Sequence, residues 1–159
     1  MARVYYLHSD PTSQAAGGAR ALAEAGVDVI KLEKPPQVED ALMPWLWAMR
    51  TRRPHITLKF AQSLDGFTAA ADGTSQWITG ESARDWVHAE SARRAAIVLG
   101  TGTALADNPS LTARFRNGGL RENQPRRVVI GKRDLKSAGD AASNLRKLGY
   151  EQYGSSLLY

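Results

Sequence analysis

A glycine-rich turn, Gly100-Thr101-Gly102-Thr103, is the first segment of this 159-residue chain whose residue types could serve chemistry. It directly follows the apolar run 95–99, which is typical of a buried strand. A glycine-rich turn at a strand end exposes backbone N–H groups that can hold a phosphate, helped by a following helix N-terminus. Because the segment matches neither G-x-G-x-x-G nor a P-loop, an ordinary strand-to-helix turn is the alternative.

A second polar segment, Ser75-Gln76-Trp77-Ile78-Thr79, comes just after an Asp-Gly turn. An indole in a loop can pack on a flat heterocycle, while neighbouring hydroxyl and amide groups fix the polar edge of that heterocycle. A tryptophan that anchors its loop to the core gives the same pattern, and that is the simpler interpretation of this segment alone.

The third segment, residues 106–112, reads Ala-Asp-Asn-Pro-Ser-Leu-Thr and precedes Arg114. It is either a plain turn or a polar loop that faces a ligand, with Arg114 as an anion contact. Lys59 lies in the alternating run 55–60, where its ammonium group reaches either solvent or a ligand. His88-Ala89-Glu90 matches half of a zinc deaminase signature, but the other half needs cysteines and the chain has none. We treat that match as coincidence and expect no metal site.

Periodicity predicts the elements that must position these residues. Strands at 4–7 and 27–30 around a helix at 13–25 predict a βαβ unit with a parallel strand pair. A helix is expected at 38–50, kinked at or beginning at Pro44. Further strands are expected at 55–60, 67–71, 95–99 and 127–130, and further helices at 81–94, capped by Thr79, and at 141–148. Residues 150–159 have no clear pattern.

Composition limits the classes of function. The chain has 43% hydrophobic residues, no cysteine, a formal net charge of +5 and no apolar run long enough to cross a bilayer. We therefore expect a soluble cytoplasmic protein that binds phosphate-bearing small molecules. A basic nucleic-acid-binding module ranks last, because the arginines are dispersed and no nucleic-acid motif is present.

Taken together, the blocks resemble the reductase part of RibD, a deaminase–reductase family of riboflavin biosynthesis. The blocks, in matching order and spacing, are Thr57-Leu58-Lys59, Ser63-Leu64-Asp65-Gly66, Ser75-Gln76-Trp77-Ile78-Thr79, Gly100-Thr101-Gly102-Thr103, and Leu105 to Thr112 with Arg114. The N-terminal βαβ part also resembles the end of the family's deaminase domain. The resemblance implies an α/β fold like dihydrofolate reductase, a mixed sheet flanked by helices.

The resemblance further implies NADPH-dependent reduction of 5-amino-6-(5-phosphoribosylamino)uracil to its ribitylamino product. Carried over by position, Lys59 would lie near the reacting ribose as the catalytic residue. The cofactor contacts would be Ala61, Trp77, Thr103 and Asp107, and the substrate contacts would be Ser75, Leu111 and Arg114. On this reading residues 1–50 are the C-terminal remnant of a cytidine-deaminase-like domain, and 54–159 are the N-terminal portion of the reductase domain.

The sequence also departs from the family pattern. Ser91 stands where the family usually has a substrate-binding arginine, although Arg93 and Arg94 are close in sequence. A Val-Glu-Gly-Gly type cofactor loop is absent, so the expected fold is incomplete. An inactive or split fragment that needs a partner chain, or a homodimer, is therefore the alternative to an active reductase.

Overall fold

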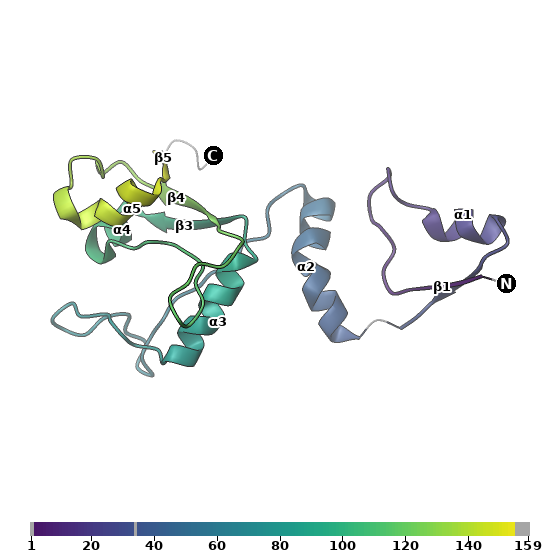
Figure 1. The fold of residues 1–159 in the computed structure, drawn as a ribbon, viewed down its shortest axis with the longest axis horizontal. Coiled ribbons are helices and arrows are strands. Elements are labelled where there is room, and N and C mark those ends of the chain that lie inside the picture. Colours follow the sequence, from purple (N-terminus) through teal and green to yellow (C-terminus); the bar gives the residue numbers. More distant parts are fainter. Residues whose placement is uncertain (1, 34, 155–159) are drawn as a thin grey trace. The chain divides into compact units, whose positions relative to one another are not determined.

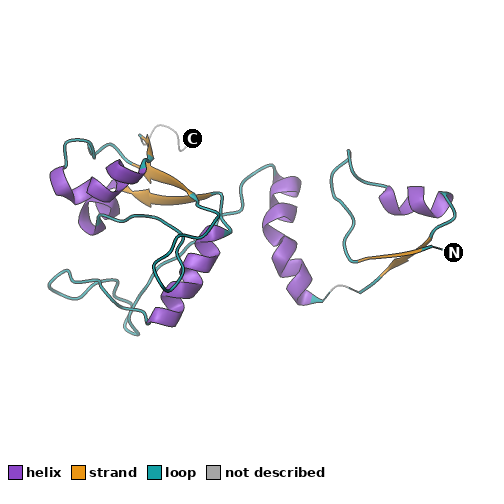
Figure 2. Cartoon of the chain, in the orientation of Figure 1, coloured by secondary structure: helices purple, strands orange, loops and turns teal. Residues whose placement is uncertain are grey.

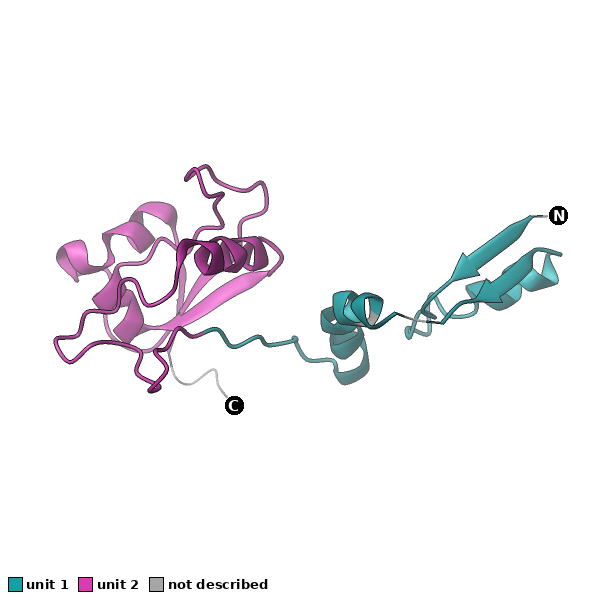
Figure 3. Cartoon of the chain, turned by 90° about the horizontal axis from the view of Figure 1, so that it is seen from below, with its two compact units in different colours: residues 1–59 teal, residues 60–159 magenta. Residues whose placement is uncertain are grey.

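The computed structural model describes residues 2–33 and 35–154 and divides the chain into two compact units, Met1–Lys59 and Phe60–Tyr159 (Figure 3). The fold class is α/β, as predicted. The boundary between the units lies after Lys59, a few residues beyond the gap between the predicted domains at 1–50 and 54–159. The domain identities assigned to residues 1–50 and 54–159 remain predictions.

The first unit contains the predicted βαβ arrangement. Strands β1 (Arg3–Tyr6) and β2 (Asp28–Lys31) are parallel, and α1 (Gly18–Glu24) connects them (Figure 1). Arg3 pairs in register with Asp28, and its Nε lies 2.6 Å from the Asp28 carboxylate. The helix is shorter than predicted, because Gly17 has φ +93° and the preceding residues form turns.

Helix α2 (Pro36–Thr51) follows. It begins earlier than predicted, with Pro36 in the first turn, and it continues through Pro44 rather than starting there. It ends at Arg52, whose φ of +57° leaves the helical region. Within the described residues, no helix combines the length and the apolar character needed to cross a bilayer.

The predicted strands at 55–60 and 67–71 are not formed. The alternation of residues in 55–60 is genuine, but a strand needs a neighbour to satisfy its backbone groups, and this segment has no ladder in the described part of the chain. The predicted Asp-Gly turns are confirmed: Gly66 and Gly73 have φ of +86° and +85°.

The second unit is built on a parallel sheet in the order β3-β4-β5 (Figure 2). The strands are β3 (Ala96–Gly100), β4 (Arg126–Ile130) and β5 (Glu151–Tyr153), the last of which the sequence did not reveal. The helices are α3 (Glu81–Ala92), α4 (Thr101–Asp107), the 3-10 turn η1 (Gly139–Ala142) and α5 (Ser143–Leu148). Thr79 does not cap α3; Gly80 holds that position without a side-chain cap.

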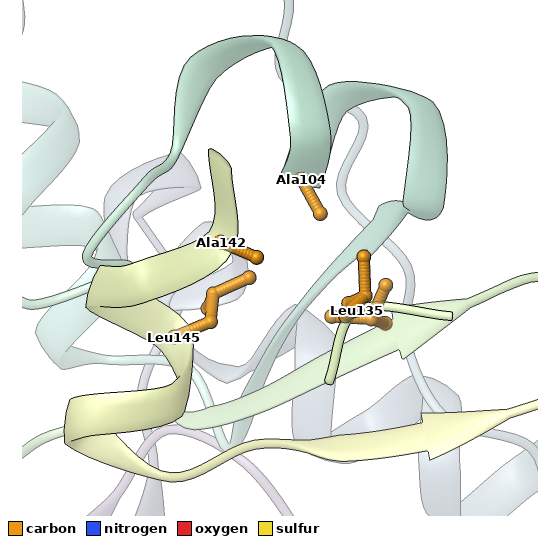
Figure 4. Packing of buried hydrophobic residues seen from close by; sticks show 5 residues of the cluster. Ala104, Leu135, Ala142 and Leu145 are labelled. Carbon is orange, nitrogen blue, oxygen red and sulfur yellow. The ribbon is translucent and has the colours of Figure 1, made fainter. Parts of the chain in front are cut away.

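A small core joins α4, η1 and α5 to β4. Its fully buried members are Ala104, Val129, Leu135, Ala142 and Leu145 (Figure 4). Because this core packs α4 on the sheet, it fixes the polar residues that α4 carries and the loop that follows α4.

Candidate functional site

The segment Ser110–Arg114 has no helix or strand, yet its middle is buried. Ala113 is 0% and Thr112 is 6% exposed. Buried backbone groups outside regular structure need other hydrogen-bonding partners. In this segment side chains from surrounding elements supply most of them, and the backbone N–H of Arg121 also donates to the Ala113 carbonyl at 3.0 Å.

Those side chains come from α3, β4 and the loop before β4. Arg127 Nε donates to the Ser110 carbonyl at 3.0 Å, and His88 Nδ1 lies 3.1 Å from the Thr112 carbonyl. Gln124 holds both backbone groups of Ala113: its Oε1 accepts from the amide at 3.0 Å, and its Nε2 donates to the carbonyl at 2.7 Å. Arg121 Nε donates to the Arg114 carbonyl at 2.9 Å.

Ion pairs connect the residues after this segment to α3. Arg116 lies 2.5 Å from Glu81, and Arg121 lies 3.4 Å from Asp85. The hydrogen bond and charge of Arg116 hold the pKa of the Glu81 carboxyl below its usual value. The loop and helix α3 therefore form one framework, and Arg114 at the end of the segment is exposed.

His88 lies half-buried inside this framework. Burial lowers the pKa of its imidazole from 6.5, and the nearby Arg114 guanidinium lowers it further. The imidazole is therefore neutral at pH 7. Because a carbonyl oxygen can only accept, the proton lies on Nδ1. Glu90 of the H-x-E match instead pairs with Arg94 at 2.7 Å, so the match has a structural explanation.

Two non-glycine residues near the segment have left-handed backbone conformations, Asn108 with φ +41° and Leu111 with φ +49°. The Asn108 conformation is fixed by α5, because its side-chain oxygen accepts from the Asn144 amide at 2.9 Å. Leu111 is half-buried, and its side chain packs against the core that includes Ala104 and Leu145, which helps to hold its conformation. Unfavourable backbone conformations concentrate at ligand-binding sites, and Leu111 is one of the residues that the sequence suggests for substrate binding.

Trp77 is 68% exposed, so it does not anchor its loop to the core. The Arg84 guanidinium lies 4.6 Å from the centre of the indole ring, a cation–π contact. Arg84 also donates to the Thr79 carbonyl. The tryptophan is thus held next to the first turns of α3. Ser75 is half-buried close by in sequence.

The glycine-rich segment is an immediate strand-to-helix junction: Gly100 ends β3 and α4 begins at Thr101. Thr103 and Asp107 are exposed and four residues apart, so they share one face of α4. Gly131, which follows β4, has φ +132°, and a Cβ there would lie 2.6 Å from Thr101 Oγ1. The two strand ends therefore approach too closely for any side chain at Gly131.

The remaining candidates are Lys59 and Ala61. Lys59 is exposed and is the last residue of the first unit, whereas Ala61 is half-buried and belongs to the second. Arg93 and Arg94 both pair with Glu90. The ligand roles of all the candidate residues remain predictions.

Sequence patterns did not reveal the residues that hold the segment Ser110–Arg114. His88 was visible only as a false metal motif, and Gln124, Arg121 and Arg127 lie in no recognisable motif. The signal that could have indicated this segment is a run without periodicity that still contains apolar residues. Such a run can be buried, and its backbone groups then need hydrogen-bonding partners.

Comparison with known proteins places this framework in a family. The profile of the RibD C-terminal domain matches residues 54–143. The riboflavin biosynthesis protein RibD of Corynebacterium ammoniagenes is 64% identical over 152 residues, which are 96% of this chain and 45% of that protein. The RibD of Mycobacterium tuberculosis is 50% identical over 133 residues, 83% of this chain and 39% of that protein.

Solved structures of two proteins with these activities or this name have a similar fold. A diaminohydroxyphosphoribosylaminopyrimidine deaminase/5-amino-6-(5-phosphoribosylamino)uracil reductase from Thermotoga maritima has a TM-score of 0.82 at 27% identity, covering 99% of this chain and 44% of that one. Acinetobacter baumannii RibD has a TM-score of 0.76 at 31% identity, covering 98% of this chain and 49% of that one. This chain thus spans less than half the length of each of these relatives. Because the family profile covers more than half of the chain, including α3, β3, α4 and the segment Ser110–Arg114, the chain belongs to the RibD C-terminal domain family.

Proposed function

We propose that the chain acts as an NADPH-dependent reductase that converts the ribose of 5-amino-6-(5-phosphoribosylamino)uracil into a ribityl chain, a step of riboflavin biosynthesis. The observation that carries the proposal is the segment Ser110–Arg114, whose backbone is fixed by four side chains while Arg114 stays exposed. The family profile covers this segment, and the Thermotoga maritima relative is named as this reductase.

Arg114 supplies the substrate's phosphate contact. A guanidinium offers a planar pair of donors that suits a phosphate, and the fixed backbone at its base reduces the entropy lost on binding. Leu111, in its left-handed conformation, and Ser75 complete the proposed substrate contacts.

The residues proposed for NADPH fit such a group chemically. Thr103 and Asp107 lie exposed on one face of α4, and Arg133 Nη1 would lie 3.7 Å from a Cβ at Gly102, so a cation stands beside the start of that helix. Trp77 offers an exposed indole for a flat ring, and Ala61 is small. Bound NADPH would supply the hydride.

The protein's own part is to orient NADPH and the substrate and to deliver a proton to the substrate. Holding donor and acceptor in contact converts a bimolecular step into an effectively unimolecular one. Lys59, as an ammonium group near the ribose, would deliver a proton during ring opening. Residues 54–159 then represent the N-terminal portion of a reductase domain and residues 1–50 a deaminase-domain remnant, in a cytoplasmic protein.

A fluorescence titration with NADPH tests the cofactor half of this proposal. Saturable quenching of tryptophan emission that is selective for NADPH over NADH, and that is lost in a Trp77→Phe variant, is expected. The other tryptophans, Trp45, Trp47 and Trp86, remain in that variant as an internal reference. Equal responses to both cofactors in a folded chain would contradict the proposal.

A second candidate is that activity requires a partner chain, either a second copy or a complementing polypeptide. The observation that favours it is the unpaired segment 54–60, in which Ile56 and Leu58 are 83% and 81% exposed. Unpaired extended segments with exposed apolar side chains readily accept another strand. Specific activity that rises with protein concentration, together with a dimer by light scattering, would support self-pairing. Constant specific activity of a monomer would refute this candidate.

A further inference from the structure

His88 joins the segment Ser110–Arg114 to helix α3. Its Nδ1 lies 3.1 Å from the carbonyl oxygen of Thr112, across 24 residues of sequence. Thr112 lies between Leu111 and Arg114, the two residues of this segment proposed to contact substrate. A shift of the Thr112 carbonyl would therefore move both.

The surroundings of His88 favour a neutral imidazole that donates through Nδ1. The charged groups that face it are Arg114 and Arg121 from the loop and Asp85 from its own helix. The two guanidinium groups disfavour a third positive charge, and Asp85 partly offsets them. The neighbouring carbonyls at Ser110 and Ala113 already have the donors Arg127 and Gln124. His88 is thus the donor that secures the middle of the segment to α3.

We propose that His88 is a positioning residue for the phosphorylated ligand, holding the Thr112 carbonyl so that Arg114 meets the phosphate. The inference rests on the proposed function of Arg114. The main effect of this hydrogen bond is on ligand geometry, because Gln124 and Arg127 hold the rest of the segment without His88.

Two substitutions separate the hydrogen bond from the ring. His88→Phe keeps a ring of similar size but removes the donor. His88→Asn keeps a donor, since its amide nitrogen can occupy the position of Nδ1. His55→Phe is the matched control, because His55 is an exposed residue of the other unit.

The probe is the reaction product, 5-amino-6-(5-phosphoribitylamino)uracil, titrated calorimetrically against each full-length variant; NADPH is titrated separately. We expect His88→Phe to weaken product affinity roughly 10- to 100-fold, as loss of one charge-assisted hydrogen bond between Arg114 and the phosphate would. NADPH affinity should change little, Tm should fall slightly because the Thr112 carbonyl loses its donor, and His88→Asn should restore most of the product affinity. A purely structural role would lower the affinity for both ligands together with Tm.

Product affinity unchanged in His88→Phe, or lost equally in both variants, would overturn the proposal. Failure of the wild-type chain to bind product would overturn the proposed function itself, and the role of His88 with it. Nitrogen NMR of the free chain provides an independent check. The proposal requires the Nδ1–H tautomer of His88, and observation of the other tautomer would refute the hydrogen bond directly.

Discussion

Replacement of Gln124 by leucine tests whether side chains hold the segment Ser110–Arg114 in place. Gln124 makes two hydrogen bonds to Ala113, of 3.0 and 2.7 Å, and Ala113 is fully buried. Each buried backbone group left without a partner costs about 1–3 kcal/mol. Because Gln124 itself is exposed, water can reach part of the gap, and the lower end applies. The Ala113 carbonyl keeps the Arg121 backbone N–H as a donor at 3.0 Å, so the group left without a partner is the Ala113 N–H, and we expect a loss of about 1 kcal/mol.

Thermal unfolding measures this effect, with a fall in Tm of roughly 4–8 °C expected for a unit of about this size. Amide exchange adds a local readout, because the Ala113 N–H should lose its protection. Gln124→Glu retains the acceptor and should cost less, and Asn123→Leu is the neighbouring exposed control. If Gln124→Leu unfolded at the wild-type temperature with the Ala113 amide still protected, the reasoning about the segment would be refuted.

Three further results are expected. Gly131→Ala should destabilise the chain by about 3 kcal/mol in chemical denaturation, because φ is +132° there and the added Cβ would lie 2.6 Å from Thr101 Oγ1. Gly139→Ala is the control and should cost less, because Gly139 also has a positive φ but open space around it. Because the pKa of His88 is lowered in the folded chain, its contribution to stability is complete above pH 6.5 and is lost as the pH falls through the folded-state pKa. The wild-type chain should therefore lose more stability on acidification than the His88→Phe variant. Arg114→Ala should abolish the preference for phosphorylated over dephosphorylated product in a binding assay, and an equal preference in both proteins would exclude the proposed phosphate contact.

The sequence predicted best those elements whose partners are close along the chain. The parallel pair β1–β2 follows from two apolar runs around a helix, and the Asp-Gly turns follow from local backbone preferences. Strand β4 and helix α3 were located within a few residues of their bounds. Motif order also located the family region, which the family profile supports.

Features that depend on distant partners were missed. The run 55–60 alternates like a strand, yet a strand forms only with a neighbour, and periodicity carries no information about the neighbour. Strand β5 is short and polar, so β4 rather than its own sequence defines it. The hydrogen bonds of His88 and Gln124 span 24 and 11 residues and follow no fixed spacing, so no local pattern could reveal them.

The measurement that tests the central claim most directly is NADPH oxidation after mixing the purified chain with 5-amino-6-(5-phosphoribosylamino)uracil. NADH and the Arg114→Ala variant serve as controls. We predict loss of NADPH absorbance with formation of one ribitylamino product per NADPH consumed, little reaction with NADH, and a strong loss of rate in the variant. No oxidation by folded wild-type chain at any protein concentration would contradict the account.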